Sequence, residues 1–552
     1  MKKLVLKNKE CFLFGIIILF SFLFQLIRAR IGLPSADEQL YIVFPFRFFQ
    51  GDLLFVDEWH SAQMIGVITN PLIALYYNLT KGSMEGVVYF FRISYIIMMT
   101  FLIIIIFINS KKNFLLILLL LLIYFSCPFN IMSLSYNTIS VASLLLMFFV
   151  LLKFQTRISF VLSGVLFAIA VLCVPYLSVL YFSFIIVYFI AKIKIHNKDM
   201  KDLLWFTIGI LIIFIIFLSI ISKGNLEELI HGVKIILNDP SHDNGAISRI
   251  LDYIIQYCRF SNIFLLIWGL ITFKMYLNKR KNINNSRLLF FSVINCIVYI
   301  LACFYIYSIA QYQYLFMNYI FMPALLGVNA ILFMKENNRR LVLIYTISFS
   351  FSLLLNLQSN VGTQPITTGL IVPCFFSLFL LIDISNNIKI KSWIYILFTL
   401  LIVYLVYTKN YIYEYQSNYF PNVKIEEGLY KGIICEDSEL EKLNDWNKEV
   451  IKINESIKNQ NKRIFLYTYS PLNYMELNHN LRIGTFSTYI YLSDVQERDN
   501  LYSEYLQIKK NDIGYIYKPK INKLIIPSMD EYVNDSCNII WESKDGYFYR
   551  CY

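Results

Sequence analysis

The sequence predicts a polytopic α-helical membrane protein with about 13 transmembrane helices and a C-terminal α/β domain outside the membrane. Hydrophobic residues make up 57% of the 552 residues and charged residues only 16%, whereas soluble proteins carry about 25% charged residues. Apolar runs of the roughly 20 residues needed to cross a bilayer recur through residues 1–408. Residues 409–552 are instead polar and rich in Asn and Lys, which indicates a separate soluble domain.

Each expected span is an apolar run bounded by a short loop. The first run, Cys11 to Ala29, is too long and too aromatic for a signal peptide, so we expect it to remain as an anchor. The spans are expected to start near Cys11, Val87, Phe114, Ile131, Ile158, Tyr176, Leu203, Ile263, Leu288, Leu315, Leu341, Ile366 and Trp393.

The distribution of basic residues predicts the orientation of these spans. Alternate short loops are basic, as at Lys111-Lys112 and residues 279–287, whereas the loops 308–314 and 358–365 contain neither Lys nor Arg. Positive residues accumulate in cytoplasmic loops. We therefore expect a multi-pass plasma membrane protein with a cytoplasmic N-terminus and an exoplasmic C-terminus. The net charge of +12 belongs to these loops, so it does not indicate a nucleic-acid partner.

The C-terminal segment alternates helix and strand patterns, as an α/β domain does. The spacing predicts helices over Glu436–Lys458 and Ser493–Lys510, a strand over Arg463–Tyr469, a buried strand over Lys523–Pro527 and a closing hairpin over Cys537–Tyr552. Cys537 and Cys551 flank that hairpin, either as a disulfide or as two free thiols. The cysteines as a whole lack the spacing of a structural zinc site.

The first outer loop, residues 30–86, contains the most informative residues of the chain. Asp37 and Glu38 follow the first span closely, and carboxylates are costly near a bilayer, so an adjacent pair indicates a site. Helical spacing after Asp37 predicts an amphipathic helix on the membrane surface that ends at Gly51-Asp52. The segment Asp57-Glu58-Trp59-His60 is then expected to bring a second acidic group to the same cavity.

Residues 30 to 75 resemble the first exoplasmic loop of GT-C glycosyltransferases, of the protein O-mannosyltransferase and aminoarabinose transferase type. The resemblance rests on the acid pair, Tyr41, Gly51-Asp52 and Pro71-Leu72. The expected span count and the outer C-terminal domain, which together cover the whole chain, are also similar to that superfamily. A second outer loop at 222–260 is large, but the later loops show no further family motif.

The resemblance implies an inverting transfer of a sugar from a polyprenyl-phosphate donor to a glycan, lipid or protein acceptor outside the membrane. Asp37 would be the general base, with Glu38 beside it. A cation would hold the departing phosphate: either an arginine or a divalent metal bound by carboxylates, which the sequence does not decide. The candidate substrate-binding residues are Tyr41, Asp57, Glu58, His60, Arg249 and Arg259.

Structural roles compete with these assignments. Asp37 and Glu38 also suit the N-terminus of a helix that Ser35 caps. His60 is more often a packing residue than a ligand, and Arg249 and Arg259 could anchor at lipid headgroups. Arg92 lies within a span, either as a buried partner of an acid or as a residue that reaches the outer boundary. A polysaccharide flippase or polymerase, or another multi-pass transporter, is the alternative function, although the expected spans carry few of the charges that transporters use.

Overall fold

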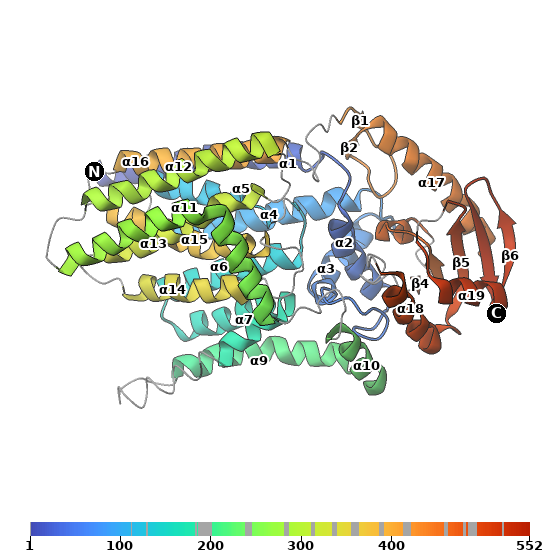
Figure 1. Cartoon of the computed structure of the whole chain (residues 1–552). Coiled ribbons are helices and arrows are strands. Elements are labelled where there is room, and N and C mark those ends of the chain that lie inside the picture. The colour runs from blue at the N-terminus through green and yellow to red at the C-terminus, as the bar shows by residue number, and fades with distance from the viewer. Residues whose placement is uncertain are drawn as a thin grey trace.

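A computed structural model describes most of the chain, with gaps at several loops. The described residues are 2–111, 113–128, 131–182, 185, 201–237, 246–280, 286–310, 315–333, 339–354, 364–385, 391–411, 421–457, 462–477, 482–483, 494–521 and 524–552. Long helices form a bundle with the N-terminus at one end and the C-terminal domain at the other (Figure 1). The helices α2, α3 and α10 lie between the bundle and that domain.

The bundle is built from apolar helices of different lengths, as in a helical membrane protein. They are α1 (Lys2–Arg28), α4 (Val87–Ile108), α5 (Phe114–Phe125), α6 (Tyr136–Lys153), α7 (Arg157–Cys173), α9 (Lys201–Ile221), α11 (Ala246–Arg280), α12 (Ser286–Ala310), α13 (Phe321–Phe333), α14 (Arg339–Leu354), α15 (Gln364–Ser385) and α16 (Lys391–Tyr411), with 3₁₀ turns η2 (Pro175–Leu177) and η4 (Leu315–Ile320). Within the described residues, 6 helices are long and apolar enough to span a bilayer, and several apolar helices are shorter. The segment expected to span from Tyr176 lies mostly outside the described residues.

Two glycines allow α7 and α9 to touch backbone to backbone. A Cβ on Gly164 would lie 2.0 Å from the Phe206 carbonyl oxygen, and one on Gly209 would lie 2.1 Å from that of Val161. Membrane helices commonly approach through small residues of this kind, since the apolar lipid supplies no hydrophobic drive for association.

The loop after the first apolar helix, residues 30–86, folds into α2 (Ala36–Phe49) and α3 (Met64–Leu79). Ser35 caps α2 by accepting a hydrogen bond from the Glu38 amide, and Gly51 follows the helix with a φ of +96° that suits glycine. The helix was expected on the membrane surface, but its residues from Leu40 to Arg47 are buried. The helix is instead enclosed by protein, because α3 and η5 (Pro471–Glu476) of the C-terminal domain pack against it.

The C-terminal domain is a mixed sheet between helices. Its elements are β1 (Val423–Lys424), β2 (Ile434–Cys435), α17 (Asp437–Ser456), β3 (Arg463–Leu466), η5 (Pro471–Glu476), β4 (Arg482–Ile483), α18 (Val495–Lys509), β5 (Ile513–Pro519), α19 (Pro527–Ser536), β6 (Cys537–Glu542) and β7 (Gly546–Cys551). The main sheet has the order β4-β3-β5-β7-β6, with β4, β3 and β5 parallel and the terminal hairpin antiparallel.

Most elements expected in this domain are present, and one is not. The helices α17 and α18, strand β3 and the terminal hairpin lie where the sequence predicts them, and a disulfide joins Cys537 to Cys551. The strand expected over Lys523–Pro527 is wrong: Leu524 to Ile526 have no regular structure, and Pro527 opens α19. The strand that precedes this segment is β5, at Ile513–Pro519, which the sequence did not predict.

Candidate functional site

The first turn of α2 holds Asp37 and Glu38, which have different surroundings. Arg92 of α4 binds Glu38 with two parallel hydrogen bonds, Nε to Oε1 at 2.8 Å and Nη2 to Oε2 at 2.9 Å. The same guanidinium donates to the carbonyl oxygens of Ala29 and Gly32 at 3.0 Å each. Arg92 is therefore the buried partner of an acid, and Glu38 is fully engaged in fixing α2 to the end of α1.

Asp37 forms no hydrogen bond or ion pair with another residue of the described chain. Its side chain is exposed to solvent, yet burial among the surrounding protein raises the pKa of its carboxyl group above the usual value. The structure therefore leaves Asp37 available to an incoming group.

Two tyrosines stand beside Asp37. Tyr136, the first residue of α6, interacts electrostatically with Asp37 and shares a side-chain hydrogen bond with Tyr41. The two tyrosine rings meet edge to face, with centroids 5.8 Å apart. Tyr41 is thus placed near the acid pair as the sequence suggested, although it is buried and packs against α6 instead of lipid.

The second acidic group does not converge on Asp37. Glu58 accepts a hydrogen bond from Arg47, near the far end of α2, at 2.5 Å. Asp37 and Arg47 are ten residues apart, which is about 15 Å along a helix axis. The expectation of one shared cavity is therefore wrong, because α2 is a continuous helix that holds the two acidic groups at its opposite ends.

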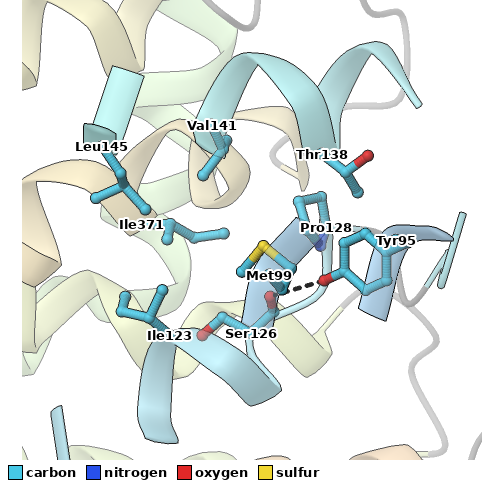
Figure 2. Close-up of a pocket in the computed structure, with 9 residues that line it drawn as sticks. All are labelled: Tyr95, Met99, Ile123, Ser126, Pro128, Thr138, Val141, Leu145 and Ile371. Carbon is cyan, nitrogen blue, oxygen red and sulfur yellow. Dashed lines mark hydrogen bonds between the residues drawn. The ribbon is translucent and has the colours of Figure 1, made fainter. Parts of the chain in front are cut away.

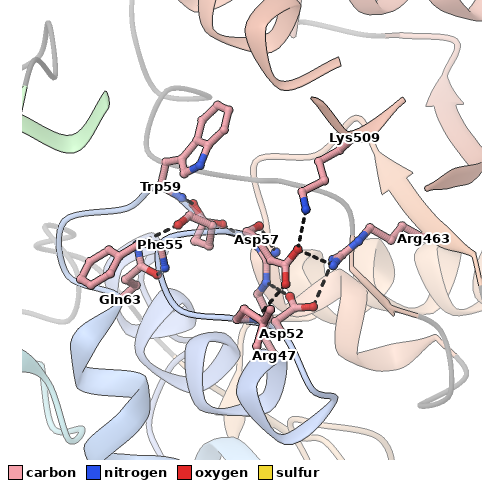
Figure 3. A network of polar contacts seen from close by, with 10 residues as sticks. Arg47, Asp52, Phe55, Asp57, Trp59, Gln63, Arg463 and Lys509 are labelled. Atoms are coloured by element: carbon pink, nitrogen blue, oxygen red, sulfur yellow. Dashed lines mark hydrogen bonds and ion pairs between the residues drawn. The ribbon is translucent and has the colours of Figure 1, made fainter. Parts of the chain in front are cut away.

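A buried ionic network occupies that far end of α2 and joins it to the C-terminal domain (Figure 3). Arg47 binds Asp52 at 2.7 Å, and Arg463 of β3 binds Asp52 at 3.1 Å and Asp57 at 2.7 Å. Lys509 of α18 lies 3.5 Å from Asp57. Lys509 also binds Glu228 of α10 (Leu226–Leu237) at 2.9 Å. Each of these carboxylates has a cationic partner, so the network docks the domain rather than offering an open charge.

The other sequence candidates have structural surroundings or lie outside the description. His60 is buried, its Nδ1 accepts a hydrogen bond from the Ala62 amide at 2.9 Å, and its ring packs on Phe44. This is a packing histidine. Arg249 and Arg259 belong to the N-terminal half of α11, but their side chains are outside the described part of the structure.

No metal centre marks the described residues. No group of three or more His, Cys, Asp or Glu side chains there could hold a metal ion. One small cavity lies among α4, α5, α6 and α15, with room for about one water molecule (Figure 2). Tyr95 and Ser126 supply its polar edge, and Thr138, two residues after Tyr136, lies on its wall.

Sequence reasoning missed the pairing of Arg47, Arg463 and Lys509 with the acids of the ionic network. Arg463 is 411 residues from Asp52 along the chain, so no local spacing signals the pair. No protein-family model matches the chain, and no curated protein matches it.

Proposed function

We propose that the protein is an inverting glycosyltransferase that uses a polyprenyl-phosphate sugar as donor and works at the outer face of the plasma membrane. The acceptor is a glycan, lipid or protein of the cell envelope. The observation that carries the proposal is the contrast within the acid pair: Glu38 is bound on both oxygens by Arg92, while Asp37 is accessible and unpaired among the described residues.

Asp37 has the properties of a general base. It accepts the proton of an acceptor hydroxyl while that oxygen bonds to the anomeric carbon from the face opposite the phosphate. The bond from the anomeric carbon to the phosphate oxygen breaks, and polyprenyl phosphate leaves with both electrons. A raised pKa strengthens the base, since proton affinity rises with pKa. Phosphate is already a competent leaving group, so no strong general acid is needed.

Glu38 is a positioning residue in this mechanism. Its ion pair with Arg92 anchors the first turn of α2 to the end of α1 and so fixes where Asp37 points. Tyr41 and Tyr136 shape the same surface. The leaving phosphate requires a cation, for which Arg249 and Arg259 remain the proposed candidates, with a divalent cation as the alternative.

The test is sugar transfer by full-length protein reconstituted in liposomes with radiolabelled polyprenyl-phosphate sugars and cell-envelope acceptors. We expect the label to leave the lipid with the unmodified protein and with Asp445→Asn, which alters an exposed carboxylate of α17. Asp37→Asn should insert normally and lose transfer by 100-fold or more, the scale of a general base at about 10²–10⁴. Label that crosses the bilayer while still on its lipid would instead support the flippase alternative and refute the proposal.

A further inference from the structure

The main sheet of the C-terminal domain has a topological switch point. Strands β3 and β5 are parallel neighbours, but the strand that follows β3 is β4 on one side, and the strand that follows β5 is β6 at the opposite edge. The two connections therefore leave the carboxyl ends of β3 and β5 in opposite directions. In open α/β sheets, ligands bind just outside such a point.

Three polar side chains meet at this place. Tyr467 directly follows β3, Lys518 lies near the end of β5, and Asp530 comes from the first turn of α19. The Tyr467 hydroxyl donates to Asp530 Oδ1 at 2.6 Å, and the Lys518 ammonium donates to the same oxygen at 2.7 Å. Lys518 also lies over the Tyr467 ring, 5.4 Å from its centroid.

This arrangement leaves binding capacity facing solvent. Both bonds go to Oδ1, so Oδ2 of Asp530 remains an acceptor, and the Lys518 ammonium has two further N–H donors. The side chains of Lys518 and Asp530 are 28% and 32% exposed. Tyr469, two residues past Tyr467, adds an exposed aromatic side chain. The ion pair has no net charge, which disfavours an anionic ligand.

We infer that this cluster of Tyr467, Lys518 and Asp530 is a binding site for a neutral saccharide. A fixed carboxylate oxygen beside an ammonium group matches two neighbouring hydroxyls of a sugar, one donating and one accepting. The exposed ring of Tyr469 suits the apolar face of a sugar ring, whereas Tyr467 is buried and holds the Asp530 carboxylate in place. The ligand class is therefore a neutral glycan and not a phosphate or a nucleotide.

The site is connected to the end of α2 that carries Asp37. Ser470, three residues after Tyr467, donates a hydrogen bond to the Gln39 side chain at 2.7 Å, and Gln39 is two residues from Asp37. A glycan held at the cluster would lie on the Asp37 side of the domain. We assign it as the acceptor glycan, and this assignment rests on the proposed glycosyltransferase function; the saccharide site itself does not.

Binding is measured directly, with full-length protein in nanodiscs and a panel of cellobiose, maltose, chitobiose and inorganic phosphate. We expect at least one disaccharide to bind, and Asp530→Ala and Lys518→Met each to weaken it about tenfold or more, the loss of a charge-assisted hydrogen bond. The matched control is Asp445→Ala, which removes a carboxylate held by Lys448 at the same 2.7 Å distance on α17. Asp37→Asn should bind like the unmodified protein.

Three results would overturn the inference: no disaccharide binds, Asp530→Ala binds as well as the unmodified protein, or phosphate binds and competes. The two proposals fail separately. Disaccharide binding that depends on Asp530 without any sugar transfer retains this site and removes the glycosyltransferase. Transfer that depends on Asp37, with no disaccharide bound, retains the glycosyltransferase and removes the saccharide site.

Discussion

Arg92 holds both carboxylate oxygens of Glu38, at 2.8 and 2.9 Å, from a position 54 residues away in the chain. The pair is buried, and Arg92 Nη1 donates hydrogen bonds to the carbonyl oxygens of Ala29 and Gly32, just after α1. This contact joins α1, α2 and α4 at the end of the bundle nearest the C-terminal domain. The Arg92–Glu38 ion pair also distinguishes the two adjacent acids, because Glu38 stabilises the fold and Asp37 has no such partner among the described residues.

Removing Arg92 should be strongly destabilising. Arg92→Met leaves Glu38 buried without its partner, which typically costs about 3–5 kcal/mol. Thermal unfolding in detergent should show a large drop in Tm, and Glu38→Gln combined with Arg92→Met should recover part of it. If the single Arg92 variant unfolds at the temperature of the unmodified protein, the ion pair is not a determinant of this junction.

The network at the far end of α2 should govern the docking of the C-terminal domain. Arg463→Met removes the cation shared by Asp52 and Asp57, so two buried carboxylates lose a partner. We expect amide hydrogen exchange to rise throughout residues 50–63 and at β3. Arg550→Met, at an exposed arginine of β7, is the control and should leave exchange unchanged. Equal exchange in both variants would mean that the apolar contacts alone hold the domain.

The bundle and the C-terminal domain differ in how readily the sequence predicts them. Apolar runs and helical spacing are local signals, so helices lie at most of the expected span starts that the structure describes, and α17, α18 and the Cys537–Cys551 hairpin were found in advance. The start near Ile131 is wrong, since α6 begins at Tyr136, and α11 begins at Ala246, well before the expected Ile263. Strand β5 was missed because it is buried between two layers, where alternation between faces no longer marks a strand.

The site was less predictable because its contacts join distant segments. The acid pair could be located from its place after the first span. That Glu38 is paired and Asp37 is not depends on Arg92, which lies on another helix. The acids at 57 and 58 were assigned to the wrong end of α2. Asp57 is bound by Arg463, 406 residues away along the chain, and Glu58 by Arg47. Local spacing carries no information about such pairs.

We expect the Asp37 carboxylate to lower the free energy of unfolding at neutral pH. Burial raises the pKa of its carboxyl group, so the folded state binds the proton more tightly than the unfolded state. Stability is therefore greatest below the ordinary pKa of about 3.9 and falls as pH rises through the folded-state pKa. Asp37→Asn should unfold at an equal or higher temperature at pH 8, lose that advantage near pH 4, and lack transfer activity. A variant less stable at both pH values would mean that Asp37 has a structural partner.

Glu476 should make the docked domain sensitive to pH. It ends η5, which packs on α2, and one of its carboxylate oxygens is buried without a hydrogen bond from any described residue. Burial raises its pKa from 4.5 to about 7. The free energy of unfolding is therefore highest below pH 4.5 and falls by about 3 kcal/mol as pH rises through 7. Glu476→Gln should flatten this dependence in thermal unfolding, whereas Glu441→Gln, at an exposed carboxylate, should retain it.

The Cys537–Cys551 disulfide provides a test of sidedness. It links the first residue of β6 to the last of β7, 14 residues apart, and such bonds persist only where the compartment is oxidising. We expect protein from growing cells, denatured in an alkylating reagent, to be modified at the free thiol of Cys435 but at Cys537 and Cys551 only after reduction. The double variant to serine should lose about 3 kcal/mol, the usual effect of a loop of about 15 residues. Modification of Cys537 before reduction would place the domain in the cytoplasm, and the outer-face mechanism at Asp37 would fail with it.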